Sequence, residues 1–247
     1  MSTESELQAK YNAAVERYQA AVQAEATAKK EKVEKWTVER KTQDGTKQYY
    51  LAWAEINKAE IAFTEKVEQR YTAAYTIHSL YADCMKYRYG DDSKEAQIAQ
   101  HRAELARTRE FVYSDSSPYW IKWYKLDCKA WWVYYEFRAE GYDKVAAELK
   151  RAREAFWDHI KGQSNGKAYR NARDAAVVAL KKWERWNDCV AWDKAKQMYD
   201  SALAKWNEFI PKGDQYAKQL EETITSRIKS LAPISELLCG HIGKSIC

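Results

Sequence analysis

Glycine and proline are scarce in this chain of 247 residues. It contains 8 Gly and 3 Pro, whereas average usage would give roughly 17 and 12 in a protein of this length. These residues form most of the tight turns that punctuate sheet proteins. Their scarcity argues against a sheet architecture and predicts an all-α fold.

Cysteine is too sparse and too scattered for a disulfide framework. The five cysteines are odd in number, lie far apart and form no C-x-x-C pair, which is unlike a small secreted domain. The first six residues are polar and acidic, and they resemble neither a secretory signal nor an Arg-rich transit peptide. We therefore expect a cytoplasmic protein in a reducing compartment.

Long apolar runs are missing as well. The longest aromatic and apolar run, from Trp131 to Tyr135, has five residues, whereas a membrane-spanning helix needs about 20. The sequence predicts no transmembrane segment.

Enzyme motifs are also absent. The chain has no H-E-x-x-H, no E-x-x-H pair of the di-iron bundles, no G-x-S-x-G and no Rossmann glycine pattern. The stretch from Gly162 to Lys167 resembles a phosphate-binding loop, but it is one residue short and no predicted strand precedes it. Cys239, His241 and Cys247 have side chains that bind zinc, but their spacing is unfamiliar. We expect no catalytic residue, metal site or cofactor, and hence a protein that is not an enzyme.

Tryptophan and tyrosine, by contrast, are abundant. The chain contains 11 Trp and 18 Tyr but only 5 Phe. Trp and Tyr combine an apolar ring with a polar tip, and both are enriched where proteins meet other proteins. Protein contact is therefore the first functional expectation.

The first 89 residues predict a long helical hairpin. Thr3 and Glu6 form a capping box, and apolar residues then recur at intervals of three and four through Val22, Val33 and Trp36. Asp44 and Gly45 supply a turn, and a second segment repeats the apolar spacing to Tyr81. Two long helices joined by a short turn lie antiparallel, so residues 1–89 are expected to form a coiled-coil arm.

Residues 90–232 predict a helical bundle or a short solenoid of helical hairpins. Asp92 with Glu95 is expected to cap a third helix, and Pro118 to begin a fourth, aromatic one. Gly141 and Asp143 separate that helix from a fifth. A long helix is expected after residues 161–166, with a kink or break near residues 186–188 and an end at Pro211. Asp214 would then cap the last helix, and residues 233–247 would form a short tail.

An internal echo at an offset of 44 residues has two interpretations. The pair Asp83-Cys84 matches Asp127-Cys128, and residues 103–105 match residues 147–149. One interpretation is a repeated helical hairpin that stacks into a curved scaffold. The other is chance similarity between amphipathic helices of similar composition.

A basic stretch carries the nucleic-acid hypothesis. Residues 161–185 contain seven Lys and Arg residues against two acidic residues, Asp174 and Glu184. Positive charge interleaved with aromatic rings suits single-stranded nucleic acid, because bases stack on rings while Lys and Arg hold phosphates. A solvated helix face is the simpler interpretation. The candidate residues for binding nucleic acid or another anion are Lys167, Arg170, Arg173, Lys181, Lys182 and Arg185.

The leading functional hypothesis is a non-catalytic structural or assembly subunit. It would pack against copies of itself or other proteins in a large complex, filament or shell through aromatic helix surfaces. The alternatives are a nucleoprotein that binds single strands through residues 161–185, and a helical scaffold apposed to a membrane. The candidate protein-contact residues cluster around predicted loops: Tyr87, Tyr89, Tyr113, Tyr119, Trp120 and Trp123.

Overall fold

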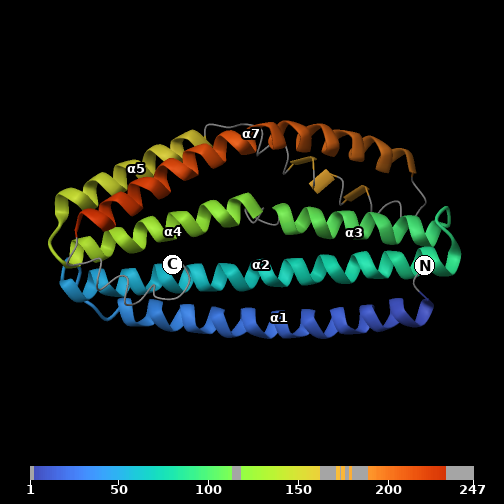
Figure 1. Cartoon of the computed structure of the whole chain (residues 1–247), viewed down its shortest axis with the longest axis horizontal. Helices are drawn as coiled ribbons and strands as arrows, with labels where there is room; N and C mark the ends of the chain where they lie inside the picture. Colours follow the sequence, from blue (N-terminus) through green and yellow to red (C-terminus); the bar gives the residue numbers. More distant parts are fainter. Residues whose placement is uncertain are drawn as a thin grey trace. The chain divides into compact units, whose positions relative to one another are not determined.

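Six helices make up the regular structure that is described. A computed structural model describes residues 3–112, 118–161 and 189–231, together with six residues between 171 and 179. The helices are α1 (Glu4–Glu39), α2 (Lys47–Tyr89), α3 (Lys94–Val112), α4 (Pro118–Ala139), α5 (Asp143–Lys161) and α7 (Cys189–Ser230) (Figure 1). The described ranges contain no strand. The predicted all-α class is therefore confirmed.

Several predicted helix ends are confirmed by their capping contacts. The Thr3 amide donates to Glu6 Oε2 (3.0 Å) and the Glu6 amide donates to Thr3 Oγ1 (3.3 Å), so the two residues form the reciprocal capping box. Gly90 follows the last residue of α2 with φ of 87°, a backbone conformation that glycine adopts without steric cost. Pro118 is the first residue of α4, where its missing N–H leaves no helical bond unmade.

The turn between α4 and α5 is tightly specified. The Tyr142 amide donates to the Phe137 carbonyl and the Gly141 amide donates to the Arg138 carbonyl, at 2.8 and 3.2 Å, which is the Schellman pattern. The Phe137 and Tyr142 rings pack at 6.4 Å. The sequence therefore fixes where α4 ends and where α5 begins, at Asp143.

Two predicted ends are wrong. Ser93, rather than Asp92, caps α3, because the Ser93 hydroxyl accepts the Ala96 amide at 3.1 Å. Helix α7 does not end at Pro211, and Asp214 lies inside it. Proline within a helix costs about 3 kcal/mol, but Phe209, Ile210 and later residues of α7 are buried on both sides of it. Burial of this apolar face offsets the cost. The expected break near residues 186–188 lies outside the described residues.

The chain divides into two compact units. Unit 1 comprises Met1–Lys32, Ala62–Tyr124 and Gln163–Ile210, and unit 2 comprises Val33–Ile61, Lys125–Gly162 and Pro211–Cys247. Each unit combines part of the predicted hairpin with later helices, so the division differs from the predicted boundary at residue 89.

In unit 1, α1 and α2 pair in antiparallel orientation. Contacts join Glu4 to Arg88 (2.8 Å), Tyr11 to Tyr81 (ring centroids 6.3 Å apart) and Glu25 to Arg70. Partner numbers fall along α2 as they rise along α1. The less exposed side of α1 follows the three- and four-residue spacing of a heptad. Its members are Leu7, Tyr11, Ala14, Tyr18, Ala21, Glu25, Ala28 and Lys32.

The contacting positions on α1 differ in part from the prediction. Val22 and Val33 are 40% and 54% exposed, so neither belongs to the contact, although both were expected there. Glu25 and Lys32 occupy the heptad positions instead. Glu25 pairs with Arg70, and Lys32 Nζ lies 4.2 Å from the Phe63 ring centroid. The position of a residue in the helical repeat, rather than its hydrophobicity, therefore decides which of these side chains is shielded from water.

In unit 2, the C-terminal half of α7 packs on α4 and α5. Its buried residues Ala217, Leu220 and Ile224 follow helical spacing. Lys129 on α4 pairs with Glu221 at 3.5 Å, and Glu148 on α5 pairs with Arg227 at 3.0 Å. These contacts identify the side of α4 that faces α7.

The 44-residue echo does not follow the helix boundaries. At this offset the turn residue Gly90 would correspond to Tyr134, which lies inside α4. The matched Asp-Cys pairs also differ in environment, since Asp127 is buried while Asp83 is exposed. Among the described helices, the echo therefore aligns side-chain composition without aligning one turn with another.

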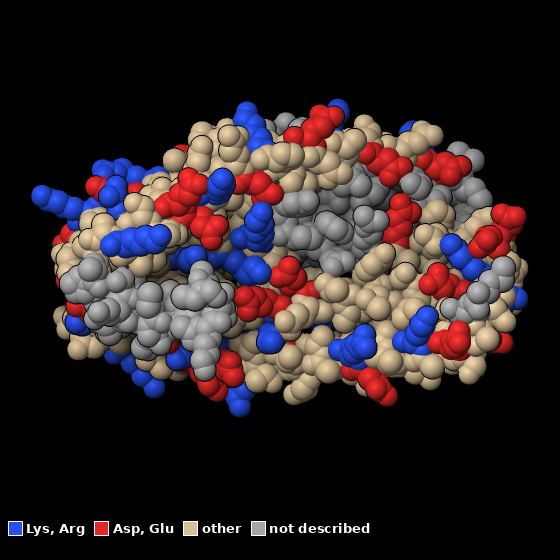
Figure 2. Space-filling view, viewed as in Figure 1, with Lys and Arg blue, Asp and Glu red and all other residues tan. Residues whose placement is uncertain are grey.

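Charges of both signs share the surface. Figure 2 shows Lys and Arg side chains interspersed with Asp and Glu side chains over the described part of one face.

Candidate protein-contact surface

Seven aromatic side chains of unit 2 form a connected set that we call the aromatic strip. All seven are half-buried: none is enclosed in the core and none is fully exposed. They come from three helices. The strip comprises Trp36 on α1, Tyr49, Tyr50 and Trp53 on α2, and Trp131, Tyr134 and Tyr135 on α4.

Ring contacts make the strip continuous from helix to helix. Trp36 and Trp53 meet nearly edge to face, with centroids 5.0 Å apart. Trp53 stacks on Tyr135 at 5.6 Å, and Tyr135 stacks on Trp131 at 5.5 Å. These separations fall within the favourable range for aromatic pairs. The rings therefore form one surface feature that extends over α1, α2 and α4.

Helical spacing explains why the rings gather on one side. On α4, Asp127, Trp131, Tyr134, Tyr135 and Arg138 recur at intervals of three and four, which places them on one face. On α2, residues 49 and 53 are four apart and share a face in the same way. Lys129, Trp132 and Glu136 form a second series on α4, and Lys129 pairs with α7. The strip thus lies on a different side of α4 from the contact with α7.

Two arginines contact rings of the strip. The Arg138 guanidinium lies 4.8 Å from the Tyr50 ring centroid, and its Nη2 donates to the Tyr50 hydroxyl at 2.6 Å. The Arg153 guanidinium, from α5, lies 4.5 Å from the Trp131 ring centroid. Such cation–π contacts favour a fixed ring orientation.

Each of these arginines also has a carboxylate partner. Arg138 Nε is 2.9 Å from Asp143 Oδ1. Arg153 Nη2 donates to Asp127 Oδ2 at 3.2 Å, and the Trp157 indole N–H donates to Asp127 Oδ1 at 2.6 Å. Asp127 is 6% exposed, so this carboxylate is buried, whereas its partners Arg153 and Trp157 are half-buried. The two pairs balance the charge of both arginines at the strip.

Tyr135 is held in its neutral form. Burial raises the pKa of its phenol to about 12, and the neighbouring Tyr49 and Tyr134 act in the same direction. At neutral pH the Tyr135 side chain therefore keeps its hydroxyl proton.

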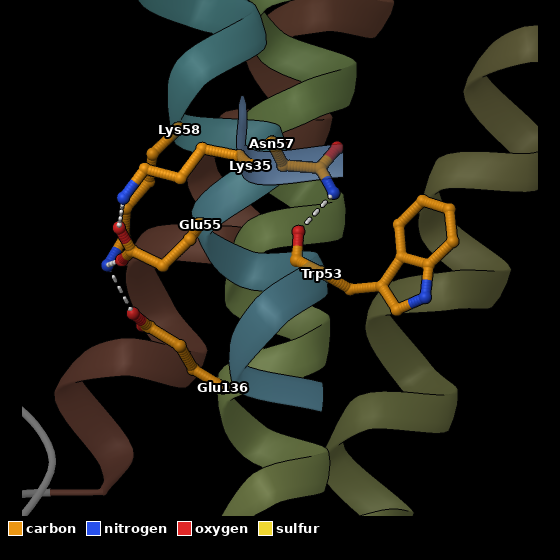
Figure 3. Close-up of polar contacts among 6 residues, drawn as sticks. All are labelled: Lys35, Trp53, Glu55, Asn57, Lys58 and Glu136. Carbon is orange, nitrogen blue, oxygen red and sulfur yellow. Dashed lines mark hydrogen bonds and ion pairs between the residues drawn. The ribbon is translucent and has the colours of Figure 1, made fainter. Parts of the chain in front are cut away.

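A network of ion pairs lies on another side of α2, and we call it the ion network. Lys58 Nζ is 3.0 Å from both Glu55 Oε1 and Glu136 Oε1, and Lys35 is 3.5 Å from Glu55. Figure 3 shows that the Trp53 ring points away from these ion pairs. Residues 53 and 55 are two positions apart on the helix, which turns their side chains about 160° from each other.

Three of the predicted contact residues have described side chains, and they have two different outcomes. Tyr87 and Tyr89 are 54% and 56% exposed, as a contact residue must be. They lie about 160° apart around α2, so they do not form one patch. Trp123 is 0% exposed and packs against Phe209 at 6.3 Å, so its assignment as a contact residue is wrong. Its position on the buried side of α4 explains the burial.

For the other predicted contact and binding residues, the structure describes either no position or no side chain. Tyr113 is outside the described residues, and the side chains of Tyr119 and Trp120 are not described although both positions belong to α4. All six nucleic-acid or anion candidates also lie outside the described residues. These are Lys167, Arg170, Arg173, Lys181, Lys182 and Arg185.

The strip itself was not predicted as a site. The apolar spacing of the first predicted helix includes Trp36, and the candidate contact residues predicted from the sequence include none of the seven strip residues. The available signal was the excess of Trp and Tyr over Phe, because residues with polar tips tolerate half-burial. The sequence indicated that some rings stay at the surface, but it did not indicate which ones.

Within the described ranges, no group of three or more His, Cys, Asp and Glu side chains is placed to hold a metal ion. None of the described helices is both long enough and apolar enough to span a membrane. Comparison of the chain with protein-family models, with curated proteins and with solved structures found no match.

Proposed function

We propose that the protein is a non-catalytic assembly subunit that packs against itself or other proteins through aromatic helix surfaces. The observation that carries this proposal is the aromatic strip, in which seven Trp and Tyr rings remain half-buried in the folded unit. Trp, Tyr and Arg are the residues that dominate binding energy at protein interfaces. The strip combines all three.

The architecture that we propose suits such a role. An antiparallel coiled-coil hairpin over residues 1–89 would provide a long structural element, and the later helices a bundle against it. The contacts between α1 and α2 in unit 1 support the antiparallel part of this description.

Photo-crosslinking in cells that express the protein tests this function. A benzophenone amino acid replaces Tyr134, on the strip, and in a matched control it replaces Lys144, an exposed residue of α5 outside the strip. We expect protein adducts from position 134 and few from position 144. A complete lack of adducts from position 134 in a folded protein would contradict an assembly role for the strip.

A second function, binding of single-stranded nucleic acid, is favoured by the composition of residues 161–185. Seven positive residues against two acidic ones would neutralise several phosphates. If about five phosphates are engaged, a plot of log K against log salt concentration should have a slope near −3.5. Absent or salt-insensitive RNA binding would remove this candidate.

A further inference from the structure

We infer that the aromatic strip is a self-complementary face that pairs with the strip of a second copy of this chain. The inference rests on the proposed function, because it names the partner of the surface proposed above.

Because the charges at the strip are already paired, the strip favours a partner surface without net charge. Arg138 and Arg153 are the cations in contact with its rings, and Asp143 and Asp127 already pair with them. An anionic partner would have to displace these carboxylates, one of which is buried. A cationic partner would face the same two guanidinium groups. A neutral face carries neither penalty, and a second copy of the strip is such a face.

The hydrogen-bonding groups of the strip also match themselves. A tyrosine hydroxyl both donates and accepts, whereas an indole N–H only donates. Four of the seven rings are tyrosines: Tyr49, Tyr50, Tyr134 and Tyr135. Hydroxyls from one copy can therefore donate to and accept from hydroxyls of the other. Ring edges and faces are likewise mutually attractive.

A self-complementary face can pair with its own copy across a two-fold axis, which gives a dimer. Most homo-oligomers are dimers in which the same patch of each subunit meets its copy. Such a patch must tolerate its own charge pattern, and a strip with paired cations does so. The ion network is a poorer candidate, because burying it against a copy would remove exposed carboxylates and ammonium groups from water.

Sedimentation equilibrium of the purified full-length protein tests the inference. We expect a dimer for the unaltered chain. Tyr134→Glu places a negative charge in the strip and should raise the dimer Kd by about 30-fold or more, the loss typical of an aromatic hot spot. Tyr89→Glu is the matched control, since Tyr89 is exposed, outside the strip and in unit 1. It should leave the Kd unchanged.

Hydroxyl-radical footprinting of the unaltered protein keeps the test independent of whether Tyr134→Glu folds. Modification of Trp131 and Tyr134 should fall at least about 3-fold between dilute and concentrated samples, as expected for rings that a dimer removes from water. Modification of Tyr87 and Tyr89 should not change. Strip protection with unchanged controls supports the inference, and equal modification at both concentrations overturns it.

The possible failures are distinguishable. A protein that stays monomeric up to its solubility limit, but gives adducts with other proteins from position 134 in cells, overturns self-pairing and leaves the assembly role intact. A dimer that persists in Tyr134→Glu, without strip protection, places the dimer contact elsewhere and also overturns the inference. A monomer without any adducts from position 134 overturns both proposals.

Discussion

Trp53 and Glu55 lie two residues apart on α2, yet they belong to surfaces of different chemistry. Trp53 stacks in the aromatic strip, and Glu55 accepts ion pairs from Lys35 and Lys58 in the ion network. Both surfaces join α1, α2 and α4 within unit 2. The strip does so through ring contacts with a few balanced charges, and the ion network does so mainly through charge.

The two surfaces differ in how favourably their exposed groups interact with water. Exposed ion pairs keep much of their hydration and contribute little to stability, about 0–1 kcal/mol each. Half-buried rings leave apolar area in contact with water, and covering that area is favourable. The ion network is therefore satisfied in an isolated chain, whereas the strip would gain stability from a partner that covered it. Three substitutions test this comparison within one chain.

The largest effect is expected at Asp127, the buried carboxylate beneath the strip. Asp127→Ala removes the partner of Arg153 and the acceptor of the Trp157 indole. An uncompensated buried charge typically costs about 3 kcal/mol or more of unfolding free energy. Chemical denaturation measures the loss.

Asp143→Ala is the matched control for Asp127→Ala. Asp143 also pairs with an arginine of the strip, but its side chain is 69% exposed. We expect a loss below about 1 kcal/mol. Equal losses at the two positions would show that burial of Asp127 is not what makes its ion pair important.

A smaller effect is expected at Lys58, the centre of the ion network. Lys58→Met keeps the aliphatic stem near the Trp132 ring but removes the ion pairs with Glu55 and Glu136. The expected loss of unfolding free energy is about 1 kcal/mol, and it should shrink as salt is added. Lys35→Met, which removes only the exposed pair with Glu55, should cost less than about 0.5 kcal/mol.

The ion network should also make the unfolding free energy depend on pH in the acidic range. Burial opposes ionisation of Glu55, but its hydrogen bond and attraction to Lys58 outweigh burial and lower its pKa below 4.5. The contribution of Glu55 to stability is therefore present above its unfolded pKa and is lost as pH falls through the folded pKa. Lys58→Met should flatten this acid loss. An unchanged acid limb would contradict the role assigned to Lys58.

The sequence predicted helices better than it predicted surfaces, and the reason is physical. Helix ends depend on local contacts such as the Thr3–Glu6 capping box and the Gly90 and Gly141 turns, which a short stretch of sequence specifies. The predicted helix end at Pro211 is wrong because the sequence shows only the local free-energy cost of proline in a helix. The buried face of α7, which offsets this cost, depends on tertiary packing. Ser93 was missed because Asp92, one residue earlier, has an equally suitable side chain.

The candidate site was less predictable, because exposure of a ring depends on which helices pack beside it. Trp123 and Trp131 both lie on α4 and have the same side chain, yet Trp123 is completely buried and Trp131 is half-buried. Only the three-dimensional arrangement separates them. Composition predicts that some Trp and Tyr remain at the surface, and the ring contacts of unit 2 identify the seven half-buried rings that form the strip.

The smallest effect at neutral pH is expected at Tyr135, and it grows in alkali. Because burial raises the pKa of this phenol to about 12 from the ordinary value of 10.0, the unfolded chain loses the proton before the folded chain does. The contribution to stability is fully present below pH 10 and disappears as pH rises toward 12. Tyr135→Phe removes the proton and should flatten the decline in unfolding free energy across this window. Tyr89→Phe, at an exposed tyrosine outside the strip, provides the baseline. If both variants decline as steeply as the unaltered chain, Tyr135 is hydrated like a surface tyrosine, and the apolar character assigned to the centre of the strip is wrong.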